Sequence, residues 1–194
     1  MSMTYDQFME YALDFKNHSD SIDDGWNIHE YKNQMTGSII KYLVKKEMQK
    51  MNKFLANPHN SEFHLEEDSE TIICEYHVLY NPSYSSPDMF FNMWFTNGKL
   101  LSIEHIWSRV HSFVKQQVNN DKWNAITQKE HPLSGIPFFR VHPCKNTHIL
   151  DNLGVSSVKT FEFNPLTTWL STISSLVGLE MHLSYGHKNI VSYN

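Results

Sequence analysis

A stretch of alternating side chains, from Thr71 to Tyr80, restricts the fold of this chain more than any other part of it. Successive side chains of a β-strand point to opposite faces, so residues two apart share a face. In this stretch every second residue is apolar or aromatic, namely Ile72, Cys74, Tyr76, Val78 and Tyr80. We therefore expect a sheet with one buried face, and we expect Cys74 to be a structural core residue.

Three further segments predict strands of the same sheet. Asp88 to Thr96 is almost continuously apolar, and the turn-forming sequence NPSYSSP separates it from the alternating strand. The dipeptide Asn97-Gly98 that follows is typical of a type I′ hairpin turn. Two segments rich in Ile, Tyr and Val lie upstream. Together they favour an antiparallel four-stranded meander, with strands at 26–31, 37–45, 71–80 and 88–96.

Helical spacing of apolar residues predicts helices before and after these strands. Thr4 begins a capping box, so a helix should run from there to about Asn17. Ser102 can cap a second helix, and Asn164 followed by proline opens a third. The order is helix, four strands, helix, cysteine-containing loop, helix. This order is typical of an α+β layer fold.

Composition and length indicate one ordinary globular domain over residues 1–194. The chain is 40% hydrophobic and 19% charged, and a chain of 194 residues can bury a sizeable core. Its formal net charge of −5 argues against nucleic acid or an anionic membrane as a partner. The polar stretch from Glu47 to Glu70 predicts a flexible insertion at about 47–70.

Targeting features point to a reduced compartment. The first residues lack the basic region, apolar core and cleavage site of a signal peptide. No run approaches the eighteen or so apolar residues of a membrane span. The two cysteines do not form the closely spaced pattern of a disulfide framework. We expect a soluble, intracellular protein.

The second cysteine, Cys144, lies in a segment suited to presenting a nucleophile. Prolines and a glycine stiffen the approach from Lys129, and proline restricts the residue before it to extended geometry. His142 and Lys145 are close in sequence, and nearby cations favour the nucleophilic thiolate. We expect a solvent-accessible thiol in a polar loop. A buried structural cysteine is the alternative.

Three chemistries are open to such a cysteine. Its neighbours could form a zinc site, but the spacing of His131, His142, Cys144 and His148 differs from that of the paired ligands of structural zinc. A cysteine hydrolase would use a nearby histidine as base and would need an orienting Asn or Asp. Acyl transfer needs an exposed thiol, an oxyanion donor and protein-binding surfaces. A lone loop cysteine without an obvious triad fits acyl transfer better than hydrolysis.

Four tracts carry a resemblance to a known family. They are EYHVLYNPSYSSP, NGKLLSIEHIW, NPLTTWLSTISSLVGLEMHLSYG and, most specific, TQKEHPLSGIPFFRVHPCKNTHIL with its His-Pro-Cys at 142–144. These tracts resemble the autophagy-related ubiquitin-like-conjugating enzymes that join the twelfth autophagy protein to the fifth. The resemblance extends from Thr71 to Gly186, and the region from Thr4 to Lys45 is compatible with it.

The resemblance implies a divergent ubiquitin-conjugating-enzyme fold and a transferase that needs no cofactor and no metal. Cys144 would accept a ubiquitin-like modifier, the twelfth autophagy protein, as a thioester from an activating enzyme, the seventh. It would then transfer the modifier to a lysine of the fifth autophagy protein, forming an isopeptide bond. Such an enzyme would act in the cytoplasm, recruited to the pre-autophagosomal membrane through partners. A non-catalytic binding module of the same fold is a further alternative.

One departure from the usual pattern concerns the oxyanion. Ubiquitin-conjugating enzymes commonly carry His-Pro-Asn before the cysteine, but here the sequence is His131-Pro132-Leu133, and leucine cannot donate a hydrogen bond. The candidate donors are Tyr84, which we favour, His131, Asn146 and backbone N–H groups near Cys144. His131 and His142 could also help the attacking lysine lose its proton, because histidine titrates near neutrality. A structural role is the alternative for both.

Overall fold

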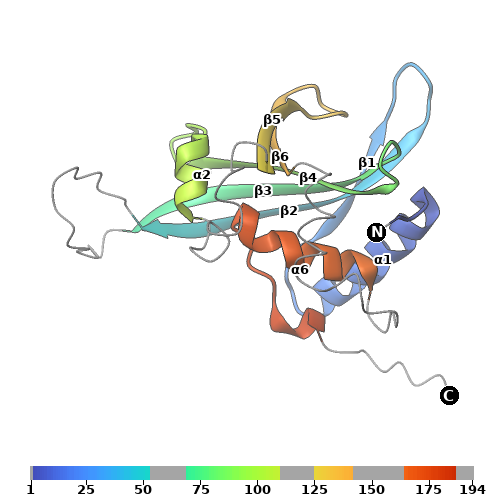
Figure 1. Cartoon of the computed structure of the whole chain (residues 1–194), viewed down its shortest axis with the longest axis horizontal. Coiled ribbons are helices and arrows are strands. Elements are labelled where there is room, and N and C mark those ends of the chain that lie inside the picture. Colours follow the sequence, from blue (N-terminus) through green and yellow to red (C-terminus); the bar gives the residue numbers. More distant parts are fainter. Residues whose placement is uncertain (1, 53–68, 110–124, 142–163, 187–194) are drawn as a thin grey trace.

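The computed structural model describes residues 2–52, 69–109, 125–141 and 164–186, which form one sheet with helices around it (Figure 1). The helices are α1 (Tyr5–Ser21), α2 (Ile103–Arg109) and α6 (Pro165–Val177), with a short 3-10 helix η2 (Leu183–Gly186). The strands are β1 (Asn27–Lys32), β2 (Ile39–Asn52), β3 (Ser69–Asn81), β4 (Ser86–Phe95), β5 (Ile126–Glu130) and β6 (Pro137–Val141).

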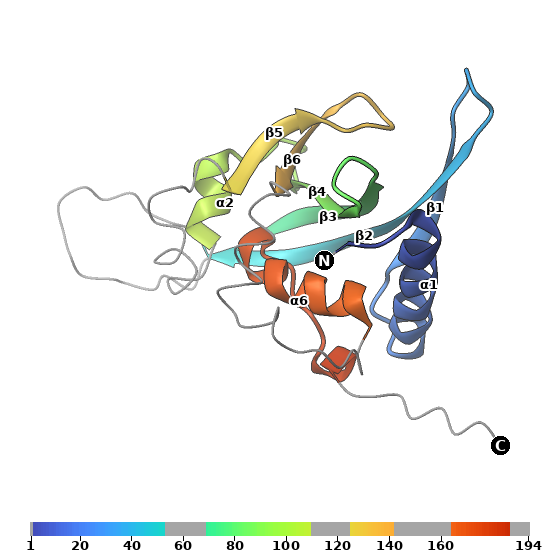
Figure 2. The same cartoon turned by 45° about the vertical axis from the view of Figure 1, so that its right-hand side comes forward.

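The sheet is antiparallel and helices lie against it, which confirms the α+β class. Its strand order is β1-β2-β3-β4-β6-β5, so the last two strands form a hairpin added beside β4. Both views show α1 and α6 on one side of the sheet, with the β5–β6 hairpin away from α6 (Figures 1 and 2). The core lies between the sheet and these two helices, and it contains Cys74, which is fully buried as predicted.

The four-stranded meander predicted from the sequence is wrong in its extent, because the sheet has six strands in the described part of the chain. The missed strand β5 is an edge strand of sequence ITQKE, and it ends in three exposed polar residues. Such a strand lacks the buried side chains that make periodicity visible. The other missed strand, β6, has five residues and starts with a proline. Hydrogen bonds to neighbouring strands, rather than composition, define both.

The turn after β4 also differs from its prediction. A type I′ turn needs positive φ at both central residues, but only Gly98 has it, at φ +83°. The Phe95 N–H donates to Lys99 O at 2.9 Å, and the Gly98 N–H donates to Phe95 O at 2.9 Å. The loop therefore has three residues and ends in a left-handed glycine. The returning chain pairs with β4 through one bridge, between Trp94 and Leu100.

The predicted flexible insertion at 47–70 is wrong at both ends. Residues from Glu47 to Asn52 continue β2 and pair with β3, in a register that runs from Glu47 opposite Cys74 to Asn52 opposite Ser69. These β2 residues are polar because Glu47 and Gln49 form hydrogen bonds beneath α6. Polar composition therefore hid a strand. Residues 53–68 lie outside the described part, so an insertion there stays a prediction.

The predicted helices agree with the structure more closely than the predicted strands do. The capping box is present, with Gln7 N–H donating to Thr4 Oγ1 at 3.2 Å and Thr4 N–H to Gln7 Oε1 at 2.9 Å. The first helix runs four residues beyond the predicted end at Asn17, to Ser21. Asn164 caps α6 through the N–H groups of the next turn. The helix buries the predicted apolar residues Leu166, Trp169, Leu170, Ile173 and Leu176. Two turns of the second predicted helix are described, as α2.

Candidate active site

The described residues include the strand that directly precedes the cysteine segment in the sequence. Strand β6 ends at Val141, three residues before Cys144 in the sequence. His142, Cys144 and Asn146 lie outside the described residues. Phe90 pairs with Arg140 and Phe91 with Phe139, so β6 runs antiparallel to β4, towards the end of the sheet where β4 begins. The β3–β4 turn, which carries Tyr84, is at that same end.

Tyr84 lies in this turn with its side chain 51% exposed. The turn is held from both sides, because Ser83 N–H donates to Asn81 Oδ1 at 3.0 Å and Met3 N–H donates to Ser85 O at 2.8 Å. Within the described part of the chain, the Tyr84 hydroxyl has no hydrogen-bond partner. An exposed hydroxyl on a fixed turn can donate to a group that arrives from outside.

His131 begins the turn between β5 and β6, and only 1% of it is exposed. The turn closes on it, because its N–H donates to Ile136 O at 2.8 Å and Gly135 N–H donates to its carbonyl at 2.9 Å. Its ring nitrogen Nδ1 accepts the backbone N–H groups of Leu133, at 3.3 Å, and Ser134, at 3.4 Å. The His131 ring is therefore hydrogen-bonded to the backbone of the turn that His131 begins.

The other ring nitrogen of His131 belongs to a buried chain of side chains. His131 Nε2 lies 2.9 Å from His77 Nδ1, and His77 Nε2 lies 2.9 Å from Glu75 Oε1. Lys46 Nζ is 3.3 Å from the second carboxylate oxygen of Glu75. We call Glu75, His77 and His131 the histidine chain. It connects β3 with the β5–β6 turn across the sheet face that is opposite α6.

The surroundings of the histidine chain keep His131 neutral. Burial, and then the proximity of His77, lower the pKa of His131 to about 4. The rings of Tyr42, Phe90 and Phe138 lie 4.9 to 6.1 Å from the His131 ring, centroid to centroid. With both nitrogens occupied inside an aromatic shell, the described conformation leaves His131 no free atom for an oxyanion or an attacking amine. This placement favours the structural alternative for His131.

An ion pair fixes β6 beside β4. Arg140 Nε lies 2.9 Å from both carboxylate oxygens of Asp88, and Asp88 is 3% exposed. A second contact between β4 and β6 is the hydrogen bond from Asn92 Nδ2 to Pro137 O, at 3.0 Å. Sequence reasoning missed these residues, and it also missed Glu75 and His77. The partners of Asn92, Asp88 and His77 are 45 to 54 positions away, and only the strand register shows that they meet.

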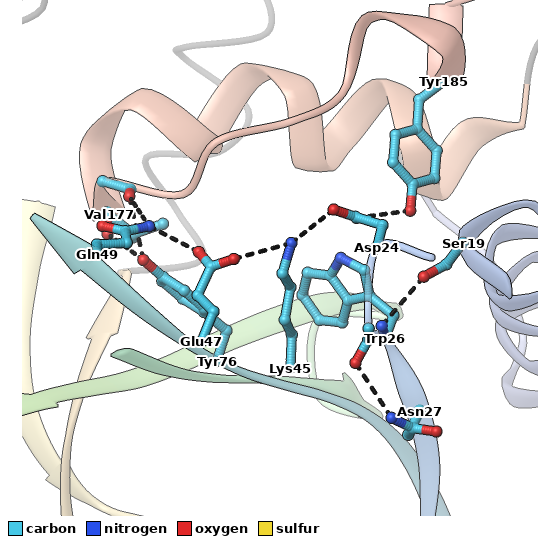
Figure 3. Close-up of polar contacts among 12 residues, drawn as sticks. Ser19, Asp24, Trp26, Asn27, Lys45, Glu47, Gln49, Tyr76, Val177 and Tyr185 are labelled. Carbon is cyan, nitrogen blue, oxygen red and sulfur yellow. Dashed lines mark hydrogen bonds and ion pairs between the residues drawn. The ribbon is translucent and has the colours of Figure 1, made fainter. Parts of the chain in front are cut away.

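A second buried polar group lies on the opposite face, between β2 and α6 (Figure 3). Lys45 Nζ lies 2.8 Å from Asp24 Oδ1 and 3.0 Å from Glu47 Oε2. Gln49 Nε2 donates to Glu47 at 2.6 Å and to the carbonyl of Gly178 at 3.0 Å. We call Asp24, Lys45, Glu47 and Gln49 the lysine cluster. It joins β2 to the C-terminal end of α6.

Two structural absences apply to the described residues alone. No helix among them is long and apolar enough to cross a membrane. They also contain no group of three or more His, Cys, Asp or Glu side chains that could hold a metal ion. Of the zinc ligands considered from the sequence, only His131 lies in the described part, and its two nitrogens are hydrogen-bonded within the protein.

Comparisons with known proteins decide the family. The family model described as "Autophagocytosis associated protein, active-site domain" matches residues 7–184. The human ubiquitin-like-conjugating enzyme ATG10 is 34% identical over 197 residues, which cover 92% of this chain and 90% of the human one. The chain belongs to the ATG10 family of ubiquitin-like-conjugating enzymes. The ATG10 of Arabidopsis thaliana is 30% identical over 60% of this chain and 53% of its own.

Membership of the ATG10 family confirms the function expected from the resemblance, ubiquitin-like conjugation in autophagy. It does not favour a cysteine hydrolase or a non-catalytic binding module. A conjugating enzyme of this kind works with a ubiquitin-like modifier and with the enzyme that activates it.

Proposed function

We propose that Cys144 is the thioester-forming cysteine of this conjugating enzyme. The observation that supports it concerns the other cysteine. The chain has two cysteines, and Cys74 is fully buried, where desolvation raises the pKa of its thiol to about 11. A thiol of that pKa supplies almost no thiolate at neutral pH and has no access to a protein partner. Transfer through a cysteine therefore requires Cys144.

The chemistry that we propose is acyl transfer in two steps. The Cys144 thiolate attacks the carbonyl carbon of the modifier's C-terminal residue, a new C–S bond forms, and the thiolate of the activating enzyme leaves. A neutral lysine amine of the target then attacks the same carbon. The C–N bond of an isopeptide forms, the C–S bond breaks, and the amine loses a proton. The modifier, activating enzyme and target are the twelfth, seventh and fifth autophagy proteins.

Tyr84 remains our preferred donor to the oxyanion of the transfer step. Cys144 follows Val141 by three positions, so chain connectivity limits their Cα atoms to about 11 Å apart. Strand β6 runs towards the end of the sheet that carries the Tyr84 turn. His142 and Asn146 stay proposals for support of the reaction. We also propose that the enzyme acts in the cytoplasm and reaches the pre-autophagosomal membrane through its partners.

The test of Cys144 is a non-reducing gel after the protein is mixed with activating enzyme, ATP and modifier. We expect a thiol-sensitive band, shifted by the mass of the modifier, in the wild type and in Cys74→Ala, and no band in Cys144→Ala. Cys74→Ala is the matched control because it removes the only other thiol. A shifted band in Cys144→Ala would contradict the proposal, and release of free modifier would favour hydrolysis.

The test of Tyr84 is the rate of transfer from the preformed thioester to the target lysine. Removal of one oxyanion donor commonly lowers a rate by a hundredfold or more, so Tyr84→Phe should slow transfer at least about tenfold while thioester loading continues. Equal transfer rates in Tyr84→Phe and wild type would remove Tyr84 from the mechanism.

A further inference from the structure

The hydrogen bonds of the histidine chain admit one arrangement of protons. Nδ1 of His131 faces two backbone N–H groups, so it must accept and carries no hydrogen. The hydrogen of a neutral His131 is then on Nε2 and points to His77 Nδ1. That nitrogen must accept in turn, which leaves the hydrogen of His77 on Nε2, directed at the Glu75 carboxylate. Every donor in this chain meets an acceptor.

An additional proton on the histidine pair disrupts this arrangement. A protonated His77 carries hydrogen on both nitrogens, so its Nδ1–H would face the Nε2–H of His131 across 2.9 Å. If His131 moved its own hydrogen to Nδ1, that hydrogen would face the N–H groups of Leu133 and Ser134. In either case two donors oppose each other, and a buried polar group without its partner is costly.

The groups that face the pair come from four elements. Glu75 on β3 attracts a proton to His77, and Lys46 on β2 opposes it by pairing with Glu75. Tyr42, also on β2, covers both rings. The neighbouring charges on β4 and β6 are Asp88 and Arg140, which form an ion pair with each other. The Glu75 carboxylate is thus the charge in direct hydrogen-bond contact with the pair.

The turn held by this chain controls a short strand. Strand β6 has five residues, and its pairing with β4 has two register positions, Phe90 with Arg140 and Phe91 with Phe139. The chain then continues to Cys144 three residues later. Because β6 meets β4 at only two register positions, its place on β4 also depends on the hairpin with β5, and so on the turn within that hairpin. A change in the turn would then shift the strand that precedes the cysteine segment.

We propose that Glu75 and His77 are positioning residues for conjugation. They hold His131 with its hydrogen on Nε2, this fixes the β5–β6 turn that precedes the cysteine segment, and a proton on the pair releases the turn. The proposal rests on the proposed role of Cys144.

NMR can observe the protons of the histidine chain without a measurement of the conjugation reaction. We would record the side-chain ¹⁵N signals of His131 and the exchange rates of the Leu133 and Ser134 amides by NMR, from about pH 8 to about pH 5, a range that spans ordinary histidine titration. We expect an Nε2–H tautomer near pH 8 and loss of amide protection on acidification. The Nδ1–H tautomer near pH 8, or amides equally protected over the whole range, would overturn the proposal.

Variants separate positioning from simple stability. His77→Gln keeps an acceptor and a donor but takes up no proton. In this variant, acidification should therefore no longer reduce the protection of the amides or the rate of transfer. His77→Phe removes both groups and should slow transfer about tenfold at every pH, because small misplacements of reacting groups are costly. Glu75→Gln keeps a neutral acceptor and should shift the loss of transfer to lower pH. Glu30→Gln, an exposed carboxylate paired with Lys41, is the matched control and should change nothing.

The rate to compare is single-turnover transfer from preformed thioester to lysine, against pH, in folded protein verified by thermal unfolding. Identical pH profiles in wild type, His77→Gln and Glu75→Gln, with the thioester intact, would refute the positioning role alone. Absence of any Cys144 thioester would refute the proposed function instead, and the NMR measurement would still decide the role of the histidine chain.

Discussion

The two buried polar groups lie on opposite faces of one sheet and are held by different interactions. Glu75 and Tyr76 are neighbours on β3, so one points to the histidine chain and the other to the lysine cluster. The lysine cluster is centred on charges in contact, because Lys45 lies between two carboxylates and its side chain is 5% exposed. The histidine chain joins the Glu75 carboxylate to two rings, and the bonds of these rings depend on where two hydrogens lie.

The lysine cluster is therefore a fixed connection between β2 and α6, whereas the histidine chain is a connection that changes with protonation. Asp24, Lys45 and Glu47 are joined by direct ion pairs. Through Gln49 and Tyr76, the cluster holds the carbonyl groups where α6 ends. The hydrogen bonds of the histidine chain depend on where two hydrogens lie, and the chain holds the turn that precedes the cysteine segment. The helix side of the sheet therefore supplies stability, and the opposite side supplies a position that protons can alter.

The largest effect should come from breaking the lysine cluster. Lys45→Met leaves two carboxylates without their cation beneath α6, and removal of one partner from a buried pair typically costs about 3–5 kcal/mol. Urea unfolding would measure the loss. Lys41→Met is the matched control on the same strand, because the Lys41–Glu30 pair is exposed and should contribute nothing measurable. Equal unfolding curves for the two variants would show that the lysine cluster does not stabilise the connection between β2 and α6.

The second effect concerns pH. The pKa of His131 is lowered to about 4, against about 6.5 in the unfolded chain, so the unfolded state binds the proton more readily between these values. The stability that His131 contributes is complete above about pH 6.5 and is lost as the pH falls towards 4, by roughly 3 kcal/mol in all.

The measurement is the free energy of unfolding against pH, in wild type and His131→Gln. We expect the wild-type slope between about pH 6.5 and 4 to be steeper than that of the variant, because glutamine takes up no proton. Parallel slopes would show that His131 is not buried in its neutral form, and this result would weaken the contrast between the two faces.

Much of the fold was predictable because its signals are local. The Thr4 capping box, the alternation around Cys74 and the apolar face of α6 each depend on residues a few positions apart. The missed parts depend on distant partners. Strand β5 is a strand because it pairs with β6, and the residues from Glu47 to Asn52 remain in β2 because they pair with β3.

The candidate site divides in the same way. Cys144 was predicted from its neighbours in the sequence, whereas the proposed roles of Glu75 and His77 follow from the contact of His77 with a histidine 54 positions away. A histidine that is followed directly by apolar residues of the same strand is the one local signal that could have indicated His77. Lys45 gives no such signal, because a lysine in a strand ordinarily faces solvent.

The smallest effect that would sharpen the comparison concerns the C-terminal segment. The Tyr185 hydroxyl donates to Asp24 Oδ2 at 2.8 Å, and the Tyr185 ring stacks on Phe15 with centroids 4.6 Å apart. Tyr185→Phe keeps the stacking and removes one hydrogen bond to a carboxylate, so it should lower the free energy of unfolding by about 1.5 kcal/mol, measured in urea. Because Asp24 keeps Lys45 as a partner, the loss should be the same at pH 8 as at about pH 6. A loss that grew on acidification would mean that the lysine cluster also responds to protons, and the two faces would then differ in degree rather than in kind.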